Sequence, residues 1–428
     1  MTSSFPRKIY LEITTRCNMR CHMCVKTAPG SRIEERDFPL ALFPRLDSCL
    51  GKADALILNG IGEPLLHPDL LAMTAYARER MPETAWIGFQ TNGLLLRPSL
   101  ADDLVRAGLG RICLSVDALD PGVSEMHGGR ETARLDEVMR MLERAGRASS
   151  RGFEVGVECV LMRDSFRQLP RLTRWAAERG ASFLLVTHAL PYAAASVPQS
   201  LFHPNTERAV AIYTRWTGVM RAQGLDPADY FASLWRYEKT ANQKRLIALV
   251  GEMIEDARKQ GVWLNLESLF GLSRETLGEV ETVLDEARAV AAETGLRLET
   301  PPVYARDERR CDFIEDDAAF IAADGAVCPC YFLWHDYSCV MDKADKRVSR
   351  KSYGSLETAS LESVWNVAEY AAFRTEVRRY EYPHCNNCSL VPCDDITGEA
   401  YPFEADCLGG NVPCGHCQWC MGGLRCLS

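Results

Sequence analysis

Three cysteines stand within eight residues near the start of the chain, in the stretch CNMRCHMC. They are Cys17, Cys21 and Cys24, and the apolar run KIYLEIT precedes them. Three thiolates can ligate three irons of a four-iron cluster and leave the fourth iron open, whereas a structural zinc site closes its shell with four ligands. The spacing therefore favours an iron–sulfur cluster with one free coordination position. His22 could complete a zinc site instead, and that alternative stays open although no second ligand pair lies nearby.

Twelve of the 18 cysteines lie from Cys311 onward. Many of them form pairs with two residues in between, and the two thiolates of such a pair can bind one metal cluster from a tight turn. The candidate ligands are Cys311, Cys330, Cys385, Cys388, Cys393, Cys407, Cys414 and Cys417, with Cys426 as a substitute. Cys420 is a doubtful ligand, and Cys328 and Cys339 are expected bystanders. Paired cysteines would also suit two zinc ribbons. Cys49, Cys113 and Cys159 stand alone in apolar surroundings and are expected to be buried small hydrophobes.

The composition indicates what class of protein carries these cysteines and in which compartment. The chain has 428 residues, 47% of them apolar and 25% charged, which is ordinary for a globular protein. Its net charge of -9 and the lack of a basic run argue against a nucleic-acid or anionic-membrane partner. No apolar signal core and no membrane-spanning apolar run is present, so we expect a cytoplasmic protein. In a reducing compartment, dense cysteine indicates metal or redox chemistry before disulfides.

Apolar runs of strand length alternate with helix-like stretches along the first half of the chain. The expected strands are Lys8 to Ile13, Ala55 to Leu58, Ala85 to Gln90, Arg111 to Val116, Phe153 to Leu161 and Ser182 to Val186. The expected helices between them include Asp69 to Arg80, Ser99 to Ala107 and Gln168 to Arg179. This alternation predicts an α/β fold with a parallel sheet, as a full or partial barrel or, as the alternative, an open doubly wound sheet. The three cysteines then occupy the first loop at the carboxyl ends of the strands, where such folds place their reactive face.

The loops after the following strands contain further motifs, and together these motifs resemble a known family. CxxxCxxC after the first strand, LILNGIGEPLLHPDL after the second, FQTNG after the third and LSVDA after the fourth together resemble the radical S-adenosylmethionine (SAM) superfamily. The resemblance implies a partial (β/α)6 TIM-like barrel. It also implies a SAM site in which Gly60, Gly62 and Glu63 receive the amino group, Ser115 and Asp117 face the ribose, Met23 lies near the adenine and Arg163 meets the carboxylate.

The same resemblance implies the chemistry. SAM would chelate the open iron of a four-iron cluster held by Cys17, Cys21 and Cys24. The reduced cluster would then cleave SAM to a 5'-deoxyadenosyl radical, which abstracts a hydrogen atom from the substrate. The cofactor performs this chemistry, while the protein orients the reactants and excludes water.

The later part of the chain divides into two further regions. Residues 204–303 are mainly helical by pattern, with LIALVGEMIEDARKQ and LGEVETVLDEARAVAAETG as helices and one short strand expected at Val262 to Leu266. Residues 304–428 resemble the SPASM domain, which binds auxiliary iron–sulfur clusters, because Cys311, Gly325 and Cys330 match its CX9-15GX4C opening. We expect two auxiliary four-iron clusters there, after a barrel at residues 1–203. The third cysteine of the CX2CX5C element comes one residue early, at Cys393, and the CX3C partner is absent, so individual ligands are not assigned.

Tyr331 narrows the choice of substrate. Sulfatase-activating members of the family carry at this position an aspartate that acts as a base. The tyrosine here therefore argues against formylglycine formation. The C-terminal pattern most resembles maturases of tungsten-cofactor aldehyde oxidoreductases. The resemblance thus implies a maturase that modifies a protein, a peptide or the cofactor of a partner oxidoreductase, with a flavodoxin- or ferredoxin-type electron donor.

Two other functions remain as alternatives. A non-enzymatic iron–sulfur electron carrier would need neither an open iron nor a ribose-binding acid. A zinc-ribbon adaptor would hold zinc instead of iron and sulfide.

Overall fold

The computed structural model describes residues 3–120, 122, 132–341, 344–381 and 413–427. Nine strands of this part of the chain form one sheet in the order β7-β6-β5-β4-β3-β2-β1-β8-β9. The strands from β1 to β7 are parallel to their neighbours, β8 joins the other edge of β1 in parallel, and β9 is antiparallel to β8. The strands are β1 Lys8–Leu11, β2 Ala55–Ile57, β3 Trp86–Thr91, β4 Arg111–Ser115, β5 Glu154–Leu161, β6 Phe183–His188, β7 Arg297–Glu299, β8 Ala318–Ile321 and β9 Val327–Cys328.

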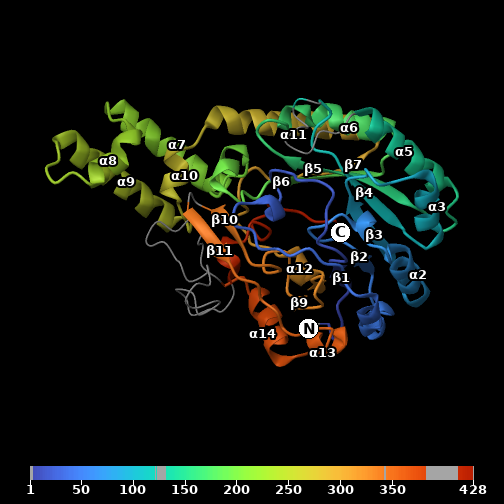
Figure 1. Cartoon of the computed structure of the whole chain (residues 1–428). Helices are drawn as coiled ribbons and strands as arrows, with labels where there is room; N and C mark the ends of the chain where they lie inside the picture. Colours follow the sequence, from blue (N-terminus) through green and yellow to red (C-terminus); the bar gives the residue numbers. More distant parts are fainter. Residues whose placement is uncertain (1–2, 121, 123–131, 342–343, 382–412, 428) are drawn as a thin grey trace.

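The apolar strand sequences follow from this topology. Both faces of a parallel sheet are covered, so its strands are continuous apolar runs, and every residue of β6 is buried. The outer face is covered by α2 (Leu70–Arg80), α3 (Pro98–Arg106), α5 (Thr132–Arg147), α6 (Leu169–Glu178) and α11 (Arg274–Thr294) (Figure 1). The predicted α/β partial barrel and all six predicted strands are confirmed, and the sheet continues past residue 203 because β7 pairs with β6.

Helices α7 to α10 form a cluster with its own apolar core, which includes Leu246, Leu249 and Met253. Their bounds are α7 Glu207–Ala222, α8 Tyr230–Leu234, α9 Ala241–Lys259 and α10 Leu266–Phe270. The cluster extends away from the barrel on the left of Figure 1. The strand predicted at Val262 to Leu266 is wrong. Asn265 caps α10 instead, its side chain accepting the Ser268 N–H (3.0 Å), and the apolar residues Val262 and Leu264 pack into the helical core.

The C-terminal region packs directly on the barrel. It contains α12 (Asp312–Glu315), the hairpin β10 (Tyr337–Met341) and β11 (Ala344–Val348), α13 (Leu361–Trp365) and α14 (Ala368–Val377). The end of the described chain crosses the open side of the barrel: the Tyr10 hydroxyl donates to the Leu427 carbonyl (3.0 Å), and the Arg425 N–H donates to Thr187 Oγ1 (3.0 Å). The C-terminus accordingly lies within the outline of the barrel in Figure 1.

The isolated cysteines lie where the sequence predicts. Cys49, Cys113 and Cys159 are buried in the apolar core. Within the described residues, no helix combines the length and apolar character needed to cross a bilayer.

Candidate functional site

The three N-terminal cysteines lie in the loop that leaves β1, and each is partly exposed. The loop is held by short-range hydrogen bonds, since the Thr27 hydroxyl donates to the carbonyls of Cys21 (2.5 Å) and Cys24 (3.0 Å). Burial raises the pKa of Cys17 and Cys24, and backbone N–H groups only partly oppose that shift. Thiols of this kind release their protons when a metal binds, which suits them as cluster ligands.

The glycine loop after β2 packs against the loop after β1. A Cβ on Gly60 would lie 2.1 Å from Cγ of Glu12, and a Cβ on Gly62 would lie 2.3 Å from the Thr14 carbonyl oxygen. No larger residue fits at either position without moving the β1 loop. Close packing therefore explains both glycines and keeps the main chain of this loop beside the cysteines.

Glu63 ties the glycine loop to the end of β3. Its carboxylate, which is almost fully buried, accepts hydrogen bonds from the Thr91 hydroxyl (2.6 Å) and the Asn92 N–H (2.8 Å). The Glu63 N–H in turn donates to the Arg16 carbonyl (2.8 Å). The side chain thus positions the loop, and the predicted contact with the SAM amino group is left to main-chain atoms of this loop.

Ser115 and Asp117 lie where β4 ends, as predicted. Asp117 is buried, and its Oδ1 accepts the Val160 N–H of β5 (2.6 Å). Ser115 is only partly buried and pairs in register with Glu158. The two predicted ribose contacts are therefore brought together at the same edge of the sheet as the cysteine loop.

Sequence reasoning missed a polar ladder on the inner side of the barrel. Asn59 Nδ2 donates to Gln90 Oε1, and Gln90 Nε2 donates to Glu158. Burial, and then the neighbouring Asp117, raise the pKa of Glu158 to about 8, so this carboxyl is mostly protonated at neutral pH. A carboxylate in the middle of the apolar strand EVGVECVL was the available signal.

Those residues also show that the barrel has room for a ligand. Gln90, Ser115 and Glu158 are partly exposed although they lie in the middle of the sheet, so protein side chains do not fill the space beside them. Amide, hydroxyl and carboxyl groups facing such a space suit a polar nucleoside. The residues present therefore fit SAM.

Glu12, also missed from the sequence, connects this site to the C-terminal region. It is completely buried; Oε1 accepts the Ile61 N–H (3.0 Å) and Oε2 accepts the Ala323 N–H (3.1 Å). The Nε2 atom of His335 lies 3.0 Å from Glu12 Oε2. One carboxylate thus fixes the glycine loop, the turn after β8 and His335, which lies two residues before β10.

Two predicted SAM contacts are less well supported by the geometry. Arg163 is exposed, and its Nε donates to the Pro198 carbonyl (2.8 Å), so the side chain is directed toward the segment after β6. Met23 is partly exposed in the cysteine loop. The roles of both residues remain predictions.

The C-terminal cysteines form a second group. Cys311, Cys414, Cys417 and Cys420 are buried together, and the main chains run side by side, with the Arg310 N–H donating to the Cys420 carbonyl (3.2 Å). Contact with Cys420 and then burial raise the pKa of Cys311 and of Cys414, while burial and then Cys420 raise that of Cys417. Cys420, treated as doubtful from the sequence, therefore lies at the centre of the group.

The remaining described cysteines differ in how close they lie to this group. The Cys426 sulfur accepts a hydrogen bond from the Trp419 indole N–H (3.2 Å). Cys330 lies near Cys420, whereas Cys328 and Cys339 are buried in β9 and β10. Four predicted ligands lie outside the described residues: Cys385, Cys388, Cys393 and Cys407.

Among the described residues, no group of three or more His, Cys, Asp or Glu side chains is arranged to hold one metal ion.

Comparison with known proteins agrees with this geometry. Residues 11–176 match the Radical SAM superfamily, and residues 311–389 match the SPASM iron–sulfur cluster-binding domain. The chain is 25% identical over 98% of its length, and 96% of the relative's, to the tungsten-containing aldehyde ferredoxin oxidoreductase cofactor-modifying protein of Pyrococcus furiosus. It is 28% identical over 58% of its length, and 74% of the relative's, to a GTP 3',8-cyclase of Parasynechococcus marenigrum.

A solved structure shares the fold. SuiB of Streptococcus suis bound to S-adenosylmethionine superposes with a TM-score of 0.51 and 13% identity, over 90% of this chain and 71% of that one. With the cysteine loop, the glycine loop and the C-terminal cysteines in place, the chain belongs to the radical SAM superfamily and carries a SPASM iron–sulfur domain.

Proposed function

We propose that this radical SAM enzyme is a maturase that modifies the cofactor of a partner oxidoreductase. The observation that carries this proposal is the similarity over nearly the full length of both chains to a protein named as a modifier of a tungsten enzyme's cofactor. Tyr331 supports it indirectly. Its ring is buried against Tyr10 and Phe313, so no carboxylate base stands at the position of the sulfatase-activating aspartate.

Cys17, Cys21 and Cys24 would hold the SAM-binding four-iron cluster, and the loop from Gly60 to Glu63 would hold SAM beside it. When bound and reduced by one electron, these cofactors supply a hydrogen-atom abstractor. The chain's own residues bind SAM and the substrate and orient them. Asp117, fixed by the Val160 N–H, presents its carboxylate to the ribose hydroxyls.

Glu158 gives the barrel a second kind of polar group. Its pKa of about 8 keeps the carboxyl neutral, so it can donate a hydrogen bond to a ligand in the barrel. The supporting hydrogen bond from Gln90 holds it in place. Substrate and SAM would therefore meet a neutral hydrogen-bond donor, Glu158, beside the carboxyl group of Asp117.

In the C-terminal region we propose two auxiliary clusters. Cys311 with Cys414, Cys417 and Cys420 would bind one, because these four buried thiols lie together. The second would draw on Cys330 and on cysteines outside the described residues. These clusters would exchange an electron with the substrate.

The test uses the anaerobically reconstituted, dithionite-reduced enzyme with SAM and a tungsten-containing aldehyde oxidoreductase as the partner. Formation of 5'-deoxyadenosine should rise when the partner is added, and the mass of the cofactor extracted from the partner should change. Unchanged cofactor mass, together with modification of a peptide offered in parallel, would assign the enzyme to peptide maturation instead.

A further inference from the structure

A cavity of about 280 Å³, here called the Arg163 cavity, lies where the barrel, the helical cluster and the C-terminal region meet. Its wall includes Arg163 after β5, Pro191 after β6, Ser268 of α10, Val340 of β10 and Gln418 of the C-terminal region. The loops after β5 and β6 leave the carboxyl ends of these strands, as the cysteine loop leaves that of β1, so the cavity lies on the reactive face of the barrel. Because Gln418 directly follows Cys417, the cavity also borders the C-terminal cysteine group.

The wall of the Arg163 cavity is positively charged. No carboxylate is among its described lining residues, and Arg163 supplies its cation. The Arg163 Nε donates to the Pro198 carbonyl (2.8 Å), which leaves the terminal nitrogens of the guanidinium for a ligand. The adjacent Asp164 accepts the side chain of Gln199 (2.7 Å) and does not line the cavity. An anion is therefore the kind of charged group that this wall attracts.

Hydroxyl groups add neutral hydrogen-bond donors to the wall. Ser200, Ser268, Ser273 and Thr276 all line it. Ser273 Oγ and Thr276 Oγ1 lie 2.9 Å apart at the start of α11, and whichever of them donates, the O–H hydrogen of the other is not used in that bond. The same helix end carries a partial positive charge, which favours an oxyanion.

His203 contributes a buried donor to the same wall. The residue is 8% exposed, and its Nδ1 accepts the Asn205 N–H (3.3 Å). Burial lowers the pKa of His203 to about 4, and the nearby main chain of Ser268 and Asn205 only partly opposes that shift, so the ring is neutral at neutral pH. With Nδ1 as an acceptor, the proton of the neutral ring lies on Nε2. That Nε2 has no hydrogen-bond partner among the described residues.

Gln418 contributes an acceptor, and the rest of the wall is mostly apolar. The Oε1 atom of Gln418 is buried and, like His203 Nε2, has no hydrogen-bond partner in the described part of the chain. Nearly all buried polar atoms of proteins are paired, so two unpaired atoms in one wall indicate a site for a polar ligand. Phe202, Leu277 and Met341 are among the apolar residues beside them. A flat, mainly apolar body with polar atoms suits this part of the cavity.

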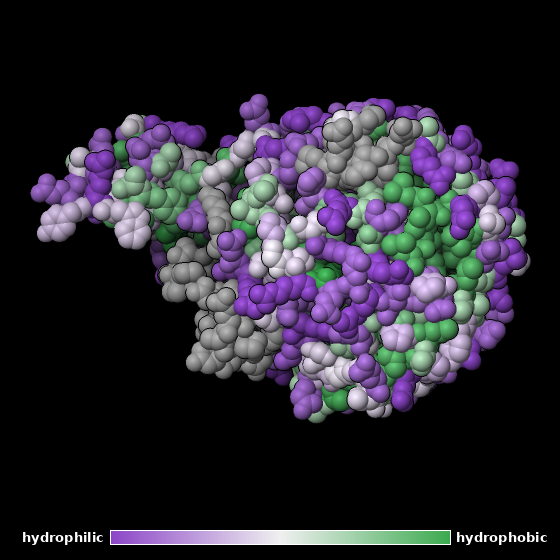
Figure 2. All heavy atoms as spheres, in the orientation of Figure 1, coloured by the Kyte–Doolittle hydropathy of each residue, from purple (hydrophilic) through white to green (hydrophobic). Residues whose placement is uncertain are grey.

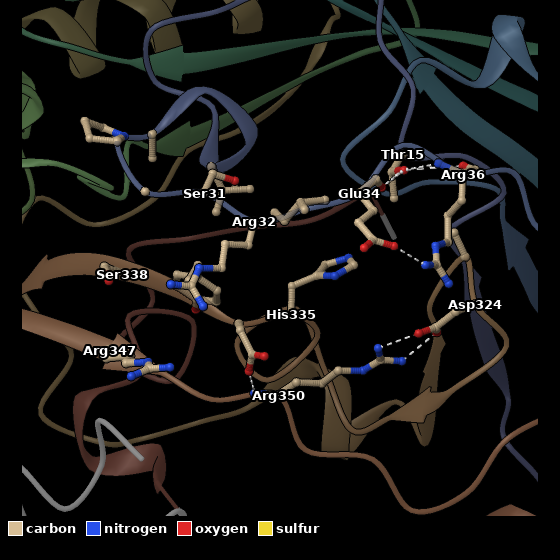
Figure 3. Close-up of a pocket in the computed structure, with 18 residues that line it drawn as sticks. Thr15, Ser31, Arg32, Glu34, Arg36, Asp324, His335, Ser338, Arg347 and Arg350 are labelled. Carbon is tan, nitrogen blue, oxygen red and sulfur yellow. Dashed lines mark hydrogen bonds and ion pairs between the residues drawn. The ribbon is translucent and has the colours of Figure 1, made fainter. Parts of the chain in front are cut away.

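A second hollow, of about 460 Å³ beside the cysteine loop, has different chemistry (Figure 3). It carries carboxylates next to its arginines: Glu34 pairs with Arg36 (2.6 Å), and Asp324 receives both terminal nitrogens of Arg350 (2.6 Å each). Figure 2 shows strongly hydrophilic residues gathered where the β10–β11 hairpin meets the barrel. These charges compensate one another within the wall, whereas the described wall of the Arg163 cavity offers its cation no carboxylate.

We propose that the Arg163 cavity is a substrate subsite that binds the phosphate or carboxylate end of a small organic cofactor. Arg163 and the hydroxyls at the start of α11 hold the oxyanion, and His203 and Gln418 hold polar atoms of the body. Arg163 then contacts the substrate instead of the SAM carboxylate. The inference rests on the proposed function, because that function requires a cofactor-sized substrate on the reactive face.

The experiment compares three probes that share one ring and differ in the attached group. Calorimetry of the anaerobically reconstituted holoenzyme, saturated with SAM, measures the Kd of phenyl phosphate, of benzoate and of the uncharged benzyl alcohol. The variants are Arg163→Gln and Thr276→Val. The matched control is Arg274→Gln, which neutralises an exposed arginine beside Ser273 that does not line the cavity. The Kd of SAM is measured separately for each protein.

We expect the wild type to bind at least one of the two anions more tightly than benzyl alcohol, and the tighter anion identifies the oxyanion as phosphate or carboxylate. Arg163→Gln should raise the Kd of that anion about threefold to tenfold, less than for a fully buried pair because Arg163 is exposed. Thr276→Val should raise it about twofold to threefold. Arg274→Gln should match the wild type, and the Kd of benzyl alcohol should be the same in all four proteins.

Equal Kd values of the three probes, or wild-type anion affinity in Arg163→Gln, would overturn the subsite. An equal loss in Arg274→Gln would also overturn it, because only the general field of the surface would then attract the anion. A rise in the Kd of SAM as large as that of the anion would place Arg163 with the SAM carboxylate and overturn the assignment as well. Selective anion binding without any change in the partner's cofactor mass would refute the proposed function and leave the subsite in place.

Discussion

The barrel site and the C-terminal cysteine group, both proposed to hold iron through thiolates, are assembled in different ways. The barrel cysteines lie within eight residues, and the loops around them are fixed by buried carboxylates on neighbouring segments, Glu12 and Glu63. The C-terminal group joins Cys311 to Cys414, Cys417 and Cys420, which lie more than 100 residues later in the chain. A local motif therefore reveals the first site, whereas the fold shows which distant cysteines of the second site lie together.

The largest expected effect concerns Cys420, at the centre of the C-terminal cysteine group. Cys420→Ala should remove one auxiliary cluster, about four irons per chain, because this thiol contacts the other three of its group. Iron analysis and visible absorbance after anaerobic reconstitution measure the loss. Cys339→Ala, a buried cysteine of β10, is the control and should keep its iron. Full iron content in Cys420→Ala would show that Cys420 is not needed as a cluster ligand.

Asp117→Ala tests the barrel side of the comparison. Loss of a charge-assisted hydrogen bond to the ribose should weaken SAM binding about tenfold to a hundredfold, on the basis of about 1.5 to 3 kcal/mol per bond. Calorimetric titration of the holoenzyme with SAM measures this Kd, and cluster iron should stay unchanged. Unaltered SAM affinity would place the ribose elsewhere.

Glu12→Gln addresses the link between the two regions. Glutamine keeps the size but turns one acceptor into a donor, which would face the Ile61 N–H or the Ala323 N–H. We expect SAM affinity to fall about threefold to tenfold, since a lost buried hydrogen bond costs about 1 kcal/mol or more. Asp69→Asn, at the start of α2, is a control carboxylate outside this network. A variant with wild-type SAM affinity would reduce Glu12 to a packing role.

The smallest expected effect is the pH dependence of stability that Glu158 causes. Its folded pKa of about 8 is above the ordinary value of 4.5, so the folded state binds the extra proton and wild-type stability falls as pH rises from about 5 to 8. Glu158→Gln carries no titrating group there. The melting temperature of the wild type should therefore fall by a few degrees relative to this variant over that range. Parallel melting curves at every pH would contradict the shifted pKa.

The sequence predicts the barrel well because its strands are continuous apolar runs and its site motifs directly follow them. It misses β7, whose residues Arg297–Glu299 are few and largely polar, and it mistakes the apolar residues Val262 and Leu264 of a helical core for a strand. Glu12, Gln90 and His335 are single polar residues without a spacing pattern. Their roles depend on contacts between distant segments, such as the 323 positions that separate His335 from Glu12.

The same reasoning explains why the sequence alone leaves Cys420 a doubtful ligand. The spacing rule of the SPASM domain ranks cysteines along the chain, but contact in space depends on how residues 306–311 lie beside residues 414–421. Position in the fold, and not position in the motif, decides which thiols can share a cluster.

The most direct measurement is the iron content and SAM cleavage of the variant in which Cys17, Cys21 and Cys24 are all replaced by alanine. After anaerobic reconstitution and reduction with dithionite, this variant should form no 5'-deoxyadenosine yet retain about eight irons per chain and a visible-absorption band. Retained SAM cleavage would contradict the assignment of the barrel cysteines. A variant that binds no iron, or that binds zinc at its C-terminal cysteines, would contradict the auxiliary clusters and make that region a structural ribbon.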